Sequence, residues 1–194
     1  QLETWVKNTK NMTEYWALPA CNFTGNLEVT LGATSRQING AEHETDFILQ
    51  GKTLFKKLET NSWGLGVVLG NIEHPLADKT KNTLGDFYMN IPTSISYWDD
   101  KFVLHVNAGL FYDREAAKTN KTWGLGSETQ LEKNTWLIAE AYGKNQETAY
   151  YQLGLRHWLV ENRLQIDAAY GNRLSSDEQW VNIGLRILSV PFLP

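Results

Sequence analysis

The chain has 194 residues, a net charge of −4 and a mean hydropathy of −0.41. No apolar run approaches the roughly 18 residues that a membrane-spanning helix needs, which excludes a helical membrane protein. The acidic balance and the absence of a basic run argue against a nucleic-acid partner. A chain of this length is most naturally one unit, so residues 1–194 are predicted to form a single domain.

Apolar and polar residues alternate with a period of two through most of the chain. At the start of one such segment Phe102, Leu104 and Val106 face one way, while His105 and Asn107 face the other. Successive side chains of a strand point to opposite faces, so the alternation predicts an all-β protein. Twelve strands are predicted, and in chain order they span residues 1–8, 13–21, 25–35, 44–55, 62–71, 85–98, 101–112, 121–131, 135–143, 147–159, 162–171 and 178–189.

The first two strands have the weakest pattern. Residues 15–21 show no clean alternation and include Pro19. Proline cannot donate a hydrogen bond to a neighbouring strand and is confined to edges, strand ends and bulges. A barrel of ten strands preceded by an N-terminal segment is therefore the alternative to twelve strands.

Charged residues within these strands follow the polar parity. Among the residues assigned to the apolar parity, His157 is the only titratable side chain apart from tyrosines. A Lys or Arg in the middle of a lipid-facing strand costs about 2–4 kcal/mol, whereas the outer face of a soluble barrel carries charges freely. The pattern predicts an antiparallel up-and-down transmembrane β-barrel, apolar towards lipid and polar towards its lumen. It disfavours a soluble ligand-carrying barrel.

The connections between the predicted strands alternate in length from the second strand onward. The short ones are residues 22–24, 56–61, 99–100, 133–134 and 161. The interleaved ones are mostly longer and more polar, at residues 36–43, 72–84, 113–120 and 172–177. Outer-membrane barrels place short turns on the periplasmic side and longer loops outside. This alternation predicts that both termini lie in the periplasm.

Aromatic residues make up 12% of the chain. Trp63, Trp123, Trp136 and Trp180 lie near the starts of predicted strands. Amphipathic rings prefer the headgroup level of a bilayer, so these positions are those of an interfacial girdle.

Four segments combine glycines, and three of them also aromatic residues, with a strict alternation: Trp-Gly-Leu-Gly at 123–126, Tyr-Gln-Leu-Gly-Leu-Arg at 151–156, Leu-Gln-Ile-Asp-Ala-Ala-Tyr-Gly at 164–171 and Val-Asn-Ile-Gly-Leu-Arg at 181–186. On these segments the chain resembles the small outer-membrane β-barrels of Gram-negative bacteria. The resemblance extends over residues 25–190. It implies a porin-like architecture in the bacterial outer membrane, reached after removal of a signal peptide that the chain no longer carries.

No residue pattern indicates a cofactor or a metal. The histidines at 43, 74, 105 and 157 are dispersed, without metal-ligand spacing. Glycines at 64, 66, 70, 124 and 126 lack the spacing and the following helix of a phosphate-binding loop. On strands they fall on the lumen face, where they leave room for bulky neighbours or allow curvature. Cys21 has no partner for an intrachain disulfide.

Ten polar residues are the candidate lining of a solute path through the lumen. They are Glu28, Asp46, Lys52, His105, Asn107, Glu128, Glu140, Arg156, Asp167 and Arg186. Opposite charges on adjacent strands would pair along the wall and stiffen it. Alternatively, they line the path and set an ion preference.

The function predicted from these features is passive, porin-like passage of small polar solutes or ions, with outer-membrane lipid as the surrounding partner. A second hypothesis is a non-enzymatic scaffold with a plugged lumen, whose protein partners the sequence does not indicate. A third is a lipid-modifying barrel enzyme. Its candidate residues are Ser94, Ser96 and His105, which lie on consecutive predicted strands.

Overall fold

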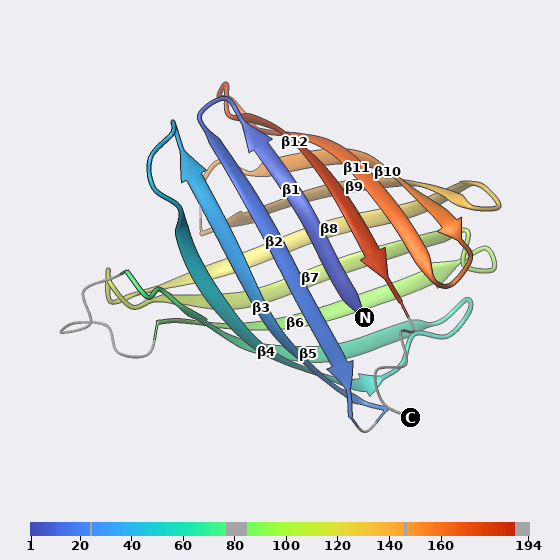
Figure 1. Ribbon diagram of the computed structural model, residues 1–194. Coiled ribbons are helices and arrows are strands. Elements are labelled where there is room, and N and C mark those ends of the chain that lie inside the picture. Colours follow the sequence, from blue (N-terminus) through green and yellow to red (C-terminus); the bar gives the residue numbers. More distant parts are fainter. Residues whose placement is uncertain (24, 77–84, 146, 189–194) are drawn as a thin grey trace.

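The computed structural model describes residues 1–194 except 24, 77–84, 146 and 189–194. The described residues form twelve strands around an open-ended cylinder (Figure 1). The strands are β1 (Leu2–Thr9), β2 (Met12–Asn22), β3 (Leu27–Ile38), β4 (Glu44–Lys56), β5 (Trp63–Glu73), β6 (Asp86–Tyr97), β7 (Phe102–Asp113), β8 (Lys118–Glu132), β9 (Thr135–Lys144), β10 (Tyr150–Val160), β11 (Leu164–Arg173) and β12 (Gln179–Ile187). Among these residues, no helix is long and apolar enough to cross a membrane.

Each strand pairs antiparallel with its neighbours in the sequence, and β1 closes the barrel against β12. In that closing pair Leu2 lies opposite Ile187 and Thr9 opposite Trp180. The chain therefore enters β1 and leaves β12 at the same end of the barrel, called here the termini end; the other is the loop end. The predicted up-and-down barrel of twelve strands is confirmed, and the ten-strand alternative is wrong.

Strand β2 accommodates Pro19 because its ladder with β3 is interrupted there. The pairing runs as far as Ala17 opposite Ala33 and resumes with Ala20 opposite Thr30. Pro19 thus lies beside a gap in hydrogen bonding, where a missing N–H costs little. On its other side Pro19 lies opposite Leu2, at the start of β1.

The predicted strand ends agree with the observed ones to within three residues. The largest differences are at β3, which continues to Ile38, at β8, which begins at Lys118, and at β10, which begins at Tyr150. Pairing of Ile38 with Met12 and of Lys118 with Asp113 extends β3 and β8 into polar sequence that shows no alternation of its own, whereas β10 begins three residues later than predicted.

The outer face of the barrel is apolar along the middle of the strands. Large apolar side chains such as Leu31, Leu69 and Ile183 are more than half exposed there. The prediction that this face lacks Lys, Arg and acidic residues fails at Lys121, and the observed strands extend beyond the predicted ends to add three more charged residues. The charged residues that share the outward parity by register are Lys56, Glu73, Lys121 and Glu132. The cost of charge falls towards the headgroup level, so strand ends tolerate these side chains.

Two turns at the termini end are held together by polar contacts. Thr60 Oγ1 donates to Asp100 Oδ2 at 2.6 Å, and Asn61 Nδ2 donates to Asp99 Oδ1 at 2.7 Å. Asp100 also accepts from Ser96. Hydrogen bonds from Ser96 and Thr60 hold the pKa of Asp100 below its ordinary value. At the termini end, side-chain hydrogen bonds therefore join these two turns in addition to the backbone hydrogen bonds between β5, β6 and β7.

Candidate functional site

The interior contains a series of three cavities. Cavity A, about 450 Å³, is lined by β1, β2 and β9–β12. Cavity B, about 470 Å³, is lined by β4 and β6–β9, and cavity C, about 310 Å³, by β4–β9. Glu140 and Tyr142 line both A and B, while Asn107 and Gly124 line both B and C. The three cavities therefore adjoin one another through shared walls.

Arg156 is the centre of the strongest charge network in the lumen. Its Nε lies 2.7 Å from Asp167 Oδ1 on β11, and its Nη1 lies 2.7 Å from Glu128 Oε1 on β8. Asp167 is directly opposite Arg156 in the ladder, but Glu128 is two strands away. In register Glu128 lies opposite Ile138 of β9, so the Arg156 side chain reaches across β9 to contact it.

Two further ion pairs join β1 to its two neighbours, β12 and β2. Arg186 Nε lies 2.8 Å from Glu3 Oε1, its register partner. Lys7 Nζ lies 3.6 Å from Glu14 Oε2, again directly opposite in the ladder, and 4.9 Å from the centroid of the Trp180 ring. These charges are thus neutralised within the wall that they line.

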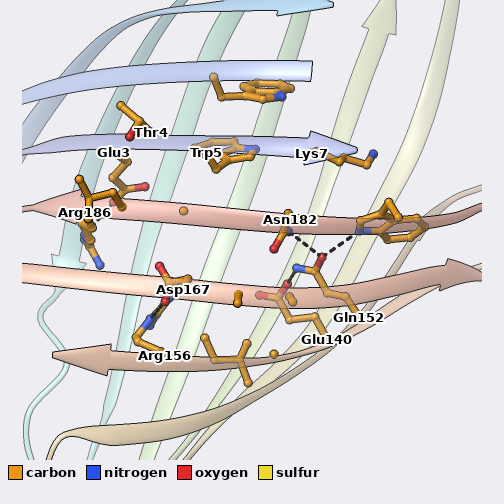
Figure 2. Close-up of a pocket in the computed structure, with 18 of the residues that line it drawn as sticks. Glu3, Thr4, Trp5, Lys7, Glu140, Gln152, Arg156, Asp167, Asn182 and Arg186 are labelled. Atoms are coloured by element: carbon orange, nitrogen blue, oxygen red, sulfur yellow. Dashed lines mark hydrogen bonds and ion pairs between the residues drawn. The ribbon is translucent and has the colours of Figure 1, made fainter. Parts of the chain in front are cut away.

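Gln152 on β10 connects polar groups from three strands (Figure 2). Its amide nitrogen donates to the Glu140 carboxylate on β9. Its carbonyl oxygen accepts from Trp180 Nε1 at 3.4 Å and from Asn182 Nδ2 at 3.5 Å, both on β12. Glu140 receives an amide hydrogen bond here but no cation.

Indole rings also line cavity A. Trp5 and Trp16 face each other across β1 and β2, with ring centroids 5.0 Å apart and planes 10° apart. Trp180 is buried, with only 3% of its surface exposed. Extending the alternation into residues 1–21 would have placed Trp5 and Trp16 inside, but the irregular second strand obscured that parity. Of the four predicted girdle residues, Trp63 and Trp123 lie on the outer face, and register places Trp136 and Trp180 inside.

The opposite wall of the lumen is built from small side chains. Register places Gly66, Val68 and Gly70 of β5 on the inner face. A Cβ at Gly70 would overlap the ring of Tyr88, whereas a Cβ at Gly124 would meet nothing nearer than 3.6 Å. The predicted role of these glycines, space for bulky neighbours, therefore holds at Gly70 but is not required at Gly124.

The structure distributes the ten candidate lining residues over several environments. Glu140, Arg156, Asp167 and Arg186 line cavity A; Lys52, His105, Asn107 and Glu140 line cavity B; Asp46 lines a separate cavity at the loop end. Glu28 accepts a hydrogen bond from Gln1 Nε2 at 3.2 Å, and Glu128 contacts Arg156 and His105. Several of the ten candidate residues are thus neutralised by ion pairs. Gln152, Trp5 and Trp16 also line the lumen, and the sequence did not predict them.

The candidate enzyme residues converge only in part. Ser94 Oγ lies 2.8 Å from His105 Nδ1, and His105 Nε2 lies 3.7 Å from Glu128 Oε1. The latter distance is too long for a hydrogen bond, and Glu128 already binds Arg156. Ser96 instead donates to Asp100. His105 faces the lumen, away from lipid, so this geometry favours a hydrogen-bonded wall over a lipid-modifying site.

A second polar cluster lies at the loop end. His74 Nδ1 is 2.8 Å from Asp46 Oδ1, and His74 Nε2 is 3.1 Å from Asp86 Oδ2. Burial lowers the pKa of His74, but its hydrogen bonds and proximity to the two carboxylates raise it to above its ordinary value. The imidazolium thus joins β4 and β6 beside the end of β5. Across the part of the chain that is described, no group of three His, Cys, Asp or Glu residues has the geometry of a metal site.

The family described as Uncharacterised conserved protein UCP029691 matches residues 1–188. No curated protein sequence matches the chain. Among solved structures, the fold resembles the KdgM porin in complex with disordered oligogalacturonate, with a TM-score of 0.74, 9% identity and coverage of 96% of this chain and 97% of the porin. It also resembles the NanC porin, with a TM-score of 0.72, 8% identity and coverage of 96% and 99%.

A third similar structure is an outer membrane channel from Pseudomonas putida F1, with a TM-score of 0.63, 10% identity and coverage of 95% of this chain and 92% of the channel. At these identities the likeness establishes the fold, a small outer-membrane barrel of the porin type. That fold and the chain's own apolar outer face indicate the bacterial outer membrane, as the sequence predicted.

Proposed function

This chain belongs to the family of uncharacterised conserved proteins UCP029691, and we propose that it is a passive outer-membrane channel for small polar solutes. The proposal rests above all on the adjoining cavities A, B and C. Among the described residues, strand residues alone line them, so no described loop fills this part of the lumen. A plugged scaffold would fill that space with a folded-in segment or with side chains.

The chemistry of the lining supports polar solutes. Carboxylates, amides, guanidinium groups and indole N–H groups line the cavities, and such groups replace part of the hydration shell of a polar solute. The KdgM porin, whose fold is similar, was solved in complex with disordered oligogalacturonate, a polar molecule. A polar solute class for this chain is consistent with both observations.

Planar bilayer recording of the purified barrel tests the proposal. We expect discrete conductance steps in the unmodified protein. Gly124→Trp should lower the conductance severalfold, because Gly124 lines both cavities B and C and a side chain built there has room to project into them. Leu125→Trp is the matched control, since its side chain lies on the lipid face, 49% exposed, and should leave the conductance unchanged.

Absence of any conductance in the correctly folded protein would contradict the channel and favour the scaffold. Equal conductance in Gly124→Trp and the unmodified protein would show that ions do not pass through cavities B and C. Gel electrophoresis of unheated and heated samples identifies the folded barrel in each preparation, because the folded and unfolded forms migrate differently.

A further inference from the structure

Nearly all charges that line cavities A and B have an ionic partner. Glu3 is paired with Arg186, Lys7 with Glu14, Arg156 with Asp167, and His105 lies 3.7 Å from Glu128. Among the described residues lining these two cavities, Lys52 and Glu140 alone have no oppositely charged group within 4 Å.

Neighbouring groups do not neutralise either residue. Glu28 is the register partner of Lys52 on β3, but its carboxylate binds the side chain of Gln1 and forms no ion pair with Lys52. Glu140 accepts a hydrogen bond from the neutral amide of Gln152. Each therefore lines the lumen without an ion-pair partner.

The two charges face the same cavity from distant parts of the wall. Lys52 lies on β4 and Glu140 on β9, with four strands between them on the shorter way around the barrel. Ion pairs such as Arg156–Asp167 present compact dipoles whose fields fall off quickly. An unpaired charge acts over roughly 8 Å at physiological ionic strength, further still where water is confined. Cavity B thus lies between a cationic and an anionic wall.

We propose that Lys52 and Glu140 are specificity-determining residues that favour small zwitterionic solutes over neutral ones. Glu140 attracts the cationic group of the solute and Lys52 its anionic group, so the solute aligns across cavity B as it passes. Because the two charges have opposite sign, they add little net preference for simple cations or anions. The inference rests on the proposed channel function and names its substrate class.

Liposome swelling and zero-current potentials test the pair. The probes are γ-aminobutyrate, a zwitterion, and erythritol, a neutral polyol of similar size; the variants are Lys52→Gln, Glu140→Gln and the double variant. In the unmodified protein γ-aminobutyrate should enter faster than erythritol. The double variant should lower the ratio of the γ-aminobutyrate entry rate to the erythritol entry rate about fivefold. This factor corresponds to about 1 kcal/mol, the energy of a contact between two charges in water.

The single variants should move the zero-current potential in a KCl gradient in opposite directions. Lys52→Gln should shift it towards cation selectivity and Glu140→Gln towards anion selectivity, with the double variant close to the unmodified protein. Lys133→Gln and Glu161→Gln are matched controls, because these residues form an exposed ion pair in turns outside the lumen. Both control variants should leave the ratio of the two entry rates and the zero-current potential unchanged.

The outcomes separate this inference from the proposed function. A folded protein without conductance overturns both. A conducting protein that admits the two probes at equal rates, or whose ratio survives the double substitution, overturns the zwitterion inference alone. Shifts of the potential in the same direction by the two single variants would also overturn it.

Discussion

The two sides of the lumen differ in how many charged side chains line them and in whether those charges form ion pairs. The paired wall, β8–β12 with β1, carries many charges and, apart from Glu140, pairs those that line cavity A through contacts such as Arg156 with Asp167 and Arg186 with Glu3. The open wall, β4–β7 where it lines cavities B and C, is built from Gln, Val, Asn, Pro and Ser, with Lys52 and His105 as its ionisable residues. Among the described residues that line these cavities, bulky and charged side chains are concentrated on the paired wall, and the open wall has more space and the unpaired Lys52.

This difference indicates that lumen charges should not be counted equally. A paired charge mainly stabilises the wall, whereas an unpaired charge interacts with the solutes and ions that pass through the lumen. A glycine serves packing only where a neighbour occupies the space of its missing side chain. The following variants test these distinctions, beginning with the largest expected effect.

Removing the guanidinium from the paired wall should destabilise the barrel most. Arg156→Gln leaves Glu128 and Asp167 without their shared cation, and we expect a loss of about 2–3 kcal/mol in the free energy of unfolding. Urea titration of the barrel in lipid vesicles measures it. Lys133→Gln, which breaks an exposed ion pair, should cost less than about 1 kcal/mol. A similar loss in both variants would contradict a special role for the Arg156 network.

Adding a methyl group at a glycine of the barrel wall should destabilise the fold only where other atoms occupy the space of the new Cβ. A Cβ at Gly109 would overlap the carbonyl oxygen of Met89 and the side chain of Asn90, so Gly109→Ala should cost about 1–3 kcal/mol. Gly124→Ala, with no atom nearer than 3.6 Å, should be close to neutral. The same urea titration compares them, and equal costs would show that the tight contact at Gly109 relaxes freely.

Removing the hydroxyl that His105 contacts should have a smaller effect. Ser94→Ala deletes one hydrogen bond of 2.8 Å and should cost about 1 kcal/mol or less, with single-channel conductance preserved. Val103→Ala on the same inner face of β7 provides a comparison without a polar contact. Hydrolysis of a soluble ester by the purified barrel that is lost on Ser94→Ala would contradict the wall interpretation and favour a catalytic serine.

The loop end should show a local dependence on pH. Because the pKa of His74 is raised in the folded barrel, its stabilising contribution is complete below the unfolded pKa of about 6.5 and is lost as the pH rises through the folded value. The difference in Tm between the unmodified protein and His74→Gln should therefore be largest at pH 5.5 and shrink by pH 8.5.

His43→Gln is the control for this titration. His43 contacts Ser35 and, within the described chain, has no carboxylate within 4 Å, so its substitution should show little pH dependence. A His74 contribution that grows with rising pH would contradict the assignment of an imidazolium between Asp46 and Asp86.

Alternation along the sequence was sufficient to predict the number of strands, their ends to within three residues, and which side chains meet lipid. It succeeded because the direction of a strand side chain depends only on its place in the local repeat. In addition, the cost of placing a charge in hydrocarbon keeps charged residues out of the lipid-facing positions of that repeat. Where the cost falls, at Lys121 near the headgroups, the repeat alone misjudged the outer face.

The partners of the lumen side chains required the closed barrel. Arg156 reaches Glu128 across an intervening strand, Trp5 stacks on Trp16, and Lys52 and Glu140 line one cavity although 88 positions separate their residue numbers. These relations depend on strand number, stagger and curvature, which are properties of the whole sheet. A local repeat assigns a residue to the inside, but only closure of the sheet brings its neighbours from other strands within reach.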